Sequence, residues 1–324
     1  MSGLARTAEA AGSGAGLEAA ASRARPGAFR TYAGALVRDK VTLVAFLFLI
    51  ALIAASALAP VVSPFDPEAQ SLMMRNQPPM SEAEAGGLLP HVLGTDQLGR
   101  DLLSRLLHGA RISLAVGFAG AIFSGTFGVL LGLVAGYFRG VVEDIIMRLV
   151  DTQMGFPSLL MALLVLYALG PGVWKVVLVL AVTRWMVYAR VTRSLVLSYR
   201  EEVFVDAART TGCTDARILF THILPNLLSP LLVLVTLEVA TMILTEASLS
   251  FLGLGIQPPQ SSWGLMLAQG RAYISTAWWL VTFPGLAILL TALSLNLGAT
   301  WVRAVTDPVT RWRYLGAGTG RAVE

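Results

Sequence analysis

The chain alternates long apolar stretches with shorter polar ones. The first apolar stretch, residues 41–62, contains no charged side chain over its 22 positions. A helix rises about 1.5 Å per residue, so this stretch can cross the roughly 30 Å hydrocarbon core of a bilayer. Further apolar stretches follow at residues 112–137, 145–169, 173–191, 223–244 and 278–302. The pattern predicts an all-α membrane protein, a polytopic bundle of six transmembrane helices.

The polar stretches set the expected limits of the parts. Residues 1–40 are rich in Ala, Gly, Ser and Arg without apolar periodicity, which is typical of a partly disordered tail. A secretory signal peptide is an alternative for 41–62, but its apolar core would be about 7–15 residues long and would not start 40 residues in. We therefore expect a retained first transmembrane helix. The other expected parts are an external segment at 63–111, a five-helix core at 112–303 and a tail at 304–324.

Small residues recur within the second apolar stretch. Gly128, Gly132 and Gly136 are four positions apart and so share one face of a helix. Rows of small residues at this spacing allow membrane helices to pack closely. We expect this face to contact another helix of the bundle.

Composition and charge exclude a soluble protein and indicate an orientation. Only 14% of the residues are charged and 55% are apolar, whereas soluble domains carry about 25% charged residues. With the N-terminus in the cytoplasm, 18 of the 24 basic residues lie on the cytoplasmic side. The positive-inside rule then predicts that both termini are cytoplasmic. It also explains the net charge of +4 without a nucleic-acid partner.

Few residues suit metal binding, nucleotide binding or catalysis. The chain has one cysteine, Cys213, and three histidines at least 17 positions apart, so we expect no metal site. A Walker A motif requires Gly-Lys, and the only lysines, Lys40 and Lys175, follow Asp39 and Trp174. We therefore expect no catalytic residue and no cofactor bound by this chain.

The polar segment at residues 201–226 is expected to form two short helices joined at Gly212. Glycine permits a turn that other residues resist, and Pro225 suits the first turn of the next helix. Val203, Ala207 and Thr210 recur at helical spacing, and we place Phe204 and Ala208 on the same face. Such a face either docks into a groove of a partner or rests on lipid headgroups.

The same segment resembles the EAA loop of ATP-binding-cassette importer permeases. That pattern is E-A-A, three residues, Gly, nine residues, then I-x-L-P. Here Asp206-Ala207-Ala208 precedes Gly212, and His222-Ile223-Leu224-Pro225 closes the pattern. Asp206 replaces the glutamate and keeps its charge, and His222 replaces an isoleucine. A His-Ile-Leu-Pro-Asn ending is typical of the dipeptide, oligopeptide and nickel branch.

Two further stretches resemble the C-type permease of that branch. One runs from His91 to Arg105 (HVLGTDQLGRDLLSR), and the other from Glu246 to Gly255 (EASLSFLGLG). Together with residues 147–160, the resemblance covers most of 38–308 and implies the type I ABC importer permease fold. The stretch Gly298-Ala-Thr-Trp-Val-Arg departs from the usual more acidic pattern, although Asp307-Pro308 fits it.

The resemblance implies a function and a set of partners. The chain would be a permease subunit of the bacterial inner membrane that transports short peptides, or nickel, opines or oligosaccharides. It would pair with a second homologous permease, two ATPase subunits that use ATP and Mg, and an extracytoplasmic solute-binding protein that docks on 63–111 and 246–277. The loop would couple the chain to the ATPases through Val203, Phe204, Asp206, Ala207, Ala208, Gly212, His222, Leu224 and Pro225.

Several acidic residues have competing interpretations. Glu238 and Asp151 lie within apolar stretches, where carboxylates are costly, so they are candidates for the translocation path. Each could instead pair with a basic group, Arg148 or a neighbouring helix in the case of Asp151. Asp96 or Thr95 is expected to cap a helix at 97–107.

Two other classes of function remain as alternatives. A secondary transporter or channel would work without nucleotide and leaves the pattern at 201–226 unexplained. An intramembrane enzyme would need a motif such as His-Glu-x-x-His, which the sequence lacks.

Overall fold

The computed structural model describes residues 34–83 and 89–306. The chain forms two compact units, one spanning residues 44–303 and the other combining 1–43 with 304–324. The predicted disorder of the N-terminal tail falls largely on residues 1–33, and Asp307-Pro308 falls on 307–324. Both lie outside the described residues.

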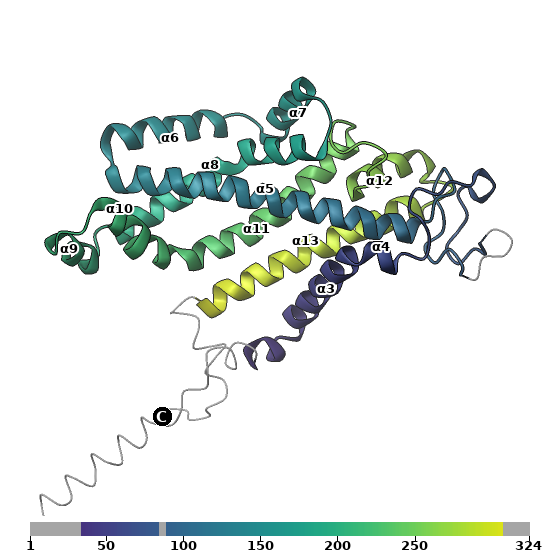
Figure 1. Cartoon of the computed structure of the whole chain (residues 1–324), viewed down its shortest axis with the longest axis horizontal. Coiled ribbons are helices and arrows are strands. Elements are labelled where there is room, and N and C mark those ends of the chain that lie inside the picture. The colour runs from purple at the N-terminus through teal and green to yellow at the C-terminus, as the bar shows by residue number, and fades with distance from the viewer. Residues whose placement is uncertain (1–33, 84–88, 307–324) are drawn as a thin grey trace, which may run out of the picture. The chain divides into compact units, whose positions relative to one another are not determined.

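The regular secondary structure of the described residues is helical, with no strand among them, and loops connect the helices (Figure 1). The helices in chain order are α3 (Lys40–Ala57), α4 (Ala59–Val62), α5 (Leu102–Phe138), α6 (Gly140–Met154), α7 (Ser158–Leu169), α8 (Val173–Tyr199), α9 (Val203–Thr210), α10 (Asp215–Arg217), α11 (Leu224–Phe251), α12 (Trp263–Gly270) and α13 (Trp279–Thr306). Each of the six predicted apolar stretches is mostly helical, which agrees with the predicted all-α class.

Fewer than the predicted six helices are long and apolar enough to cross a membrane in the described part of the chain. Four helical segments in the described part of the chain are long and apolar enough to span a bilayer: Lys40–Ala57, Leu102–Phe138, Asp215–Phe251 and Trp279–Thr306. The stretch at 145–169 is broken, because Pro157 separates α6 from α7 and the two helices meet at 88°. This bent pair would make a fifth span. Helix α8 is long enough but carries four basic residues, so the count of six is not confirmed.

Helix α5 begins later and runs further than the sequence predicted. It has 37 residues, and its N-cap is Asp101, whose carboxylate accepts the backbone N–H of Ser104 at 2.7 Å. The predicted start of this helix at 97, with Asp96 or Thr95 as its cap, was therefore wrong, although an aspartate of the same stretch does cap it. Asp96 instead accepts the N–H groups of Leu98 and Arg100 within a turn. Gly99 has a φ of +73° there, which a non-glycine residue would adopt only under strain.

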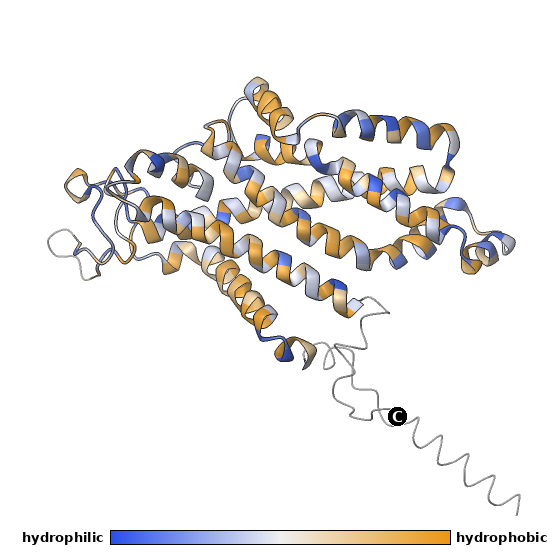
Figure 2. Ribbon diagram, turned by 180° about the vertical axis from the view of Figure 1, so that it is seen from behind, coloured by the Kyte–Doolittle hydropathy of each residue, from blue (hydrophilic) through white to orange (hydrophobic). Residues whose placement is uncertain are grey.

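The glycine row of α5 packs against α8, as predicted. A Cβ atom added at Gly132 would lie 2.6 Å from the carbonyl oxygen of Ala189, and one at Gly136 would lie 2.7 Å from the Cβ of Val196. Gly128 meets the backbone of Trp185 and Ala189 in the same way. Figure 2 shows apolar residues along most of the length of the long helices, with polar residues concentrated near α9, α6 and the loops.

Candidate functional site

The 201–226 segment forms the two short helices and the turn that its sequence predicts. Helix α9 ends at Thr210, and Gly212 follows with a φ of +79° in open space. Thr214 caps α10 by accepting the N–H of Arg217. A π-helical turn, Ile218–Ile223, then leads into α11, with Pro225 in its first turn. Figure 1 shows α9 and α10 beyond the adjoining ends of α5, α8 and α11.

Helix α9 has one buried and one exposed face. Val205 and Ala208 are buried and pack in a cluster with Ile218, Leu219, Leu133 and Val196. On the other face Val203 is 82% exposed and Phe204 is 37% exposed. Asp206 and Ala207 are also exposed.

One predicted residue belongs to the other face of α9. Ala208 was placed beside Val203, but it is buried next to Val205. Val203 and Ala208 are five residues apart, which places them about 140° apart around the helix. Val205 and Ala208 are three residues apart and are therefore neighbours on one face. Ala208 therefore anchors α9, and Val203, Phe204 and Ala207 remain free on the surface of this chain.

The C-terminal part of the predicted EAA-loop pattern, His222 to Pro225, forms the junction between the π-helical turn and α11. His222 and Leu224 are half-buried, and Pro225 is exposed. The Nδ1 atom of His222 lies 3.3 Å from the carbonyl oxygen of Arg217, and Asn226 donates to the carbonyl of His222 at 2.6 Å. These residues shape the turn that supports α9.

Tyr137, in the last turn of α5, is buried and connects that helix to the segment. Its hydroxyl donates to the Oδ1 atom of Asp215 at 2.6 Å. The guanidinium groups of Arg200 and Arg209 lie 5.8 and 5.6 Å from the centre of its ring, within the range of a cation–π contact. Arg200 also donates to the Tyr137 carbonyl. Sequence reasoning missed Tyr137, because 78 positions separate it from Asp215.

The two acidic residues of the predicted translocation path are both paired with arginines of α8. Arg184 donates to the two carboxylate oxygens of Glu238 at 2.9 and 2.8 Å, and this pair is largely buried between α8 and α11. Asp151 pairs with Arg190 at an exposed position, rather than with Arg148. Pairing of Asp151 with a neighbouring helix was one of the two alternatives predicted for it, but neither arginine could be named as the partner from the sequence.

A second cluster of charged residues lies at the N-terminal end of α5. Asp96 binds Arg100 at 2.7 Å and also binds Arg105, and all three side chains are buried. Arg105 donates further to the Oε1 atom of Gln269 in α12, at 3.1 Å. We call Asp96, Arg100, Arg105 and Gln269 the Asp96 network.

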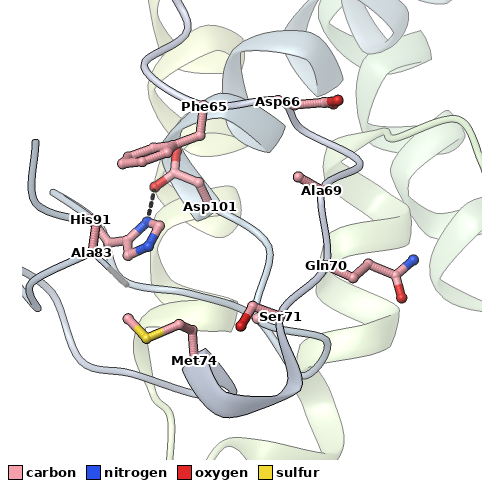
Figure 3. Close-up of a pocket in the computed structure, with 10 residues that line it drawn as sticks. Phe65, Asp66, Ala69, Gln70, Ser71, Met74, Ala83, His91 and Asp101 are labelled. Carbon is pink, nitrogen blue, oxygen red and sulfur yellow. Dashed lines mark hydrogen bonds and ion pairs between the residues drawn. The ribbon is translucent and has the colours of Figure 1, made fainter. Parts of the chain in front are cut away.

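A small pocket adjoins this network. His91 lies 2.9 Å from Asp101 and stacks on Phe65, with ring centres 4.5 Å apart (Figure 3). His91, Asp101 and Phe65 line the pocket, together with polar residues such as Gln70. No group of three metal-ligating side chains occurs among residues 34–83 and 89–306.

Comparison with known families identifies the kind of protein that carries this geometry. Residues 128–312, more than half of the chain, match the family of binding-protein-dependent transport system inner membrane components. The chain belongs to this family. Residues 32–79 match the N-terminal transmembrane domain of oligopeptide transport permease C, in agreement with the predicted C-type resemblance.

Individual relatives of this inner membrane component agree with the assignment. A di/tripeptide transport system permease protein of Pseudomonas aeruginosa is 41% identical, covering 87% of this chain and 93% of its own length. A dipeptide transport system permease protein of Haemophilus influenzae is 38% identical, covering 84% and 91%. A structure of the MetNI methionine ABC transporter in inward-facing conformations matches with a TM-score of 0.50 and 19% identity. It covers 63% of this chain and 97% of that chain, and this likeness supports the fold alone.

Family membership confirms the predicted class of function. The chain is a membrane-embedded permease subunit of an ABC importer and not an enzyme, and ATP hydrolysis in such importers lies in separate subunits. It decides against a secondary transporter or channel that works without ATPase subunits.

Proposed function

We propose that this permease pairs with a second homologous permease to form the translocation path of an importer for short peptides. Two ATPase subunits, which bind ATP and Mg, would drive it, and an extracytoplasmic solute-binding protein would deliver the substrate. The names of the relatives, which specify dipeptides and tripeptides, support this substrate class. Nickel, opines and oligosaccharides are the alternatives to be tested by competition.

The exposed face of α9 carries the proposal. A short helix that presents Val203, Phe204 and Ala207 outward fits a groove in a partner protein, because docking would remove their apolar surface from water. Val205 and Ala208 hold the helix on the permease while the outer face stays available. Asp206, which is also exposed, adds a charge for recognition. We therefore assign Val203, Phe204, Asp206 and Ala207 to the ATPase contact.

The other predicted coupling residues have a supporting role in this proposal. Gly212 supplies the left-handed turn that ends α9. Ala208 anchors the helix, and His222, Leu224 and Pro225 form the turn into α11. These residues would hold α9 in position on the permease. They would not contact the ATPase directly.

The distribution of basic residues supports the orientation. It supports a topology with both termini and the 201–226 segment in the cytoplasm, where ATP is available, and segment 63–111 outside. The outer segment presents exposed apolar side chains, including Met73, Leu72 and Met80, and loop 246–277 adds Ile274. We propose this surface as the docking site of the solute-binding protein.

Glu238 and Asp151 stay candidates for the translocation path. Because Arg184 occupies both carboxylate oxygens of Glu238, any contact with substrate there would involve the ion pair and not a free carboxylate. A path that presents both charges suits the two charged ends of a short peptide.

The test compares two equally exposed apolar residues at the two proposed docking surfaces. Val203 and Met73 are 82% and 83% exposed, so neither substitution should disturb folding. In the assembled transporter, Val203→Glu should abolish co-purification of the ATPases and ATP-driven uptake of a labelled dipeptide. Met73→Glu should retain the ATPases and lose stimulation by the solute-binding protein.

Two results would contradict the proposal. One is a Val203→Glu transporter that keeps both its ATPases and its uptake, as expected if α9 rests on lipid headgroups. The other is dipeptide uptake by the two permeases reconstituted without any ATPase. If Ni²⁺ or an oligosaccharide competed with uptake and unlabelled dipeptide did not, the proposed substrate class would be wrong, while the proposed ATPase contact would stand.

A further inference from the structure

The contacts of Tyr137 form a continuous connection from the exposed face of α9 to helix α5. Asp206 on that face lies 3.4 Å from Arg209, one turn later in α9. Arg209 lies over the Tyr137 ring, and the Tyr137 hydroxyl binds Asp215 on the far side of the Gly212 turn. A single side chain of α5 thus contacts the segment before and after its turn.

The Tyr137 side chain is suited to transmit displacement because its contacts are directional. Its hydroxyl bond to a carboxylate is short and charge-assisted, so it resists separation of α10 from α5 more than apolar contact would. Arg200, the residue after α8, binds both the ring and the carbonyl of Tyr137. Movement of α9 or α10 would therefore displace the ends of both α5 and α8.

Helix α5 leads from this point to the opposite end of the permease. Its 37 residues span about 55 Å without a proline. At its other end, Asp101 caps the helix and Arg105 belongs to the Asp96 network. A continuous helix held firmly at one end and by Tyr137 at the other provides a physical connection between two distant surfaces.

We propose that Tyr137 is a positioning residue of the transport cycle, which passes displacement of α9 to α5 and onward to the segment around Asp96. The proposal rests on the proposed function of α9 as the ATPase contact. It adds that the hydroxyl of Tyr137 links ATP hydrolysis to the binding-protein side, without contacting substrate or nucleotide.

The test removes that hydroxyl in the complete transporter with both permeases, the ATPases and the solute-binding protein. Tyr137→Phe keeps the ring under Arg200 and Arg209 and loses only the bond to Asp215. We expect the ATPases to remain bound and basal ATP hydrolysis to persist. Dipeptide uptake per ATP hydrolysed should fall about fivefold or more, the lower range of coupling between distant sites. Asp215→Ala should give the same fall, and the double variant should add nothing.

Tyr199→Phe is the matched control. Tyr199 is the last residue of α8 and packs at the edge of the same apolar cluster. The Tyr199→Phe transporter should keep the wild-type uptake per ATP hydrolysed if the effect is specific to Tyr137. Asp215→Asn retains an acceptor oxygen and should restore most of the coupling lost in Asp215→Ala.

The outcomes separate this inference from the proposed function. A Tyr137→Phe transporter with the wild-type uptake per ATP overturns the role of Tyr137 while leaving the α9 contact intact. A uniform fall in melting temperature and in every activity, with an unchanged ratio, also overturns it, because that pattern reflects a structural role. Failure of the wild-type chain to bind ATPases would overturn the proposed function itself.

Discussion

The two ends of helix α5 are held in different ways. At its N-terminal end, Asp96, Arg100 and Arg105 form ion pairs that are almost completely buried. At its C-terminal end, the ion pair of α9 is exposed: the side chain of Asp206 is 67% exposed and that of its partner Arg209 is 38% exposed. The pair of Arg193 and Glu143 beside this end is partly buried. The buried contact at this end is made mainly by one neutral side chain, Tyr137, and by apolar residues.

This difference indicates which end of the permease can rearrange. Breaking a buried ion pair leaves an uncompensated charge and is strongly destabilising, whereas an exposed pair contributes roughly 0–1 kcal/mol. The segment around Asp96 is therefore fixed to the helix by buried charges, whereas the 201–226 segment is held by Tyr137 and by apolar contacts, which can shift without exposing a buried charge. The proposed role of α9, which must follow the motion of an ATPase, requires the arrangement found at the C-terminal end.

The largest expected effect comes from breaking the fixed end. Asp96→Asn would leave Arg105 and Arg100 without their carboxylate in a buried site, at a cost of about 3–5 kcal/mol. We expect a marked fall in the melting temperature of the purified transporter and poor recovery of folded protein by size exclusion.

Glu82→Gln provides the control for that substitution. Glu82 is an exposed carboxylate of the same segment, so its replacement should leave the melting temperature unchanged. Equal melting temperatures for Asp96→Asn and the wild type would show that the Asp96 network does not fix this end of α5.

Local patterns in the sequence predicted the features that depend on neighbours in the chain. The spacing of Gly128, Gly132 and Gly136 predicted the packed face of α5, and Gly212 and Pro225 predicted the turn and the restart of the helix. The α9 helix followed from the amphipathic pattern around Val203.

Features that depend on distant residues did not follow from the sequence. Asp96 and Asp101 are both good capping residues, and the positions of Arg100 and Arg105 in the fold commit Asp96 to ion pairs. The partners Arg184 of Glu238 and Asp215 of Tyr137 are 54 and 78 positions away, so they require knowledge of which helices adjoin. The bend at Pro157 was visible as an interruption, but its angle depends on packing.

A smaller effect should distinguish packing at the two ends of α5. Gly132→Ala would force a methyl group against the backbone of α8, and overpacking of this kind costs typically about 1–3 kcal/mol. Gly109 lies near the Asp96 network, and a Cβ there would meet its nearest atom, on Trp263, at 3.4 Å. Gly109→Ala should therefore be nearly neutral in chemical unfolding of the permease, and equal losses for the two variants would contradict tighter packing at Gly132 than at Gly109.

The smallest expected effect concerns Arg139, between α5 and α6. Its guanidinium lies 3.8 Å from the carboxylate of Glu201, and both side chains are at least half exposed, so this pair should contribute little. Its backbone, however, has a φ of 57° and a ψ of −170°, a conformation that costs a residue other than glycine about 1–3 kcal/mol. Arg139→Gln, which removes the pair and keeps the strain, should change stability by less than about 1 kcal/mol. Arg139→Gly removes both and should raise the melting temperature slightly, because relief of strain exceeds the lost attraction. A lower melting temperature in both variants would instead show that the exposed charges near Tyr137 hold this end of α5 after all.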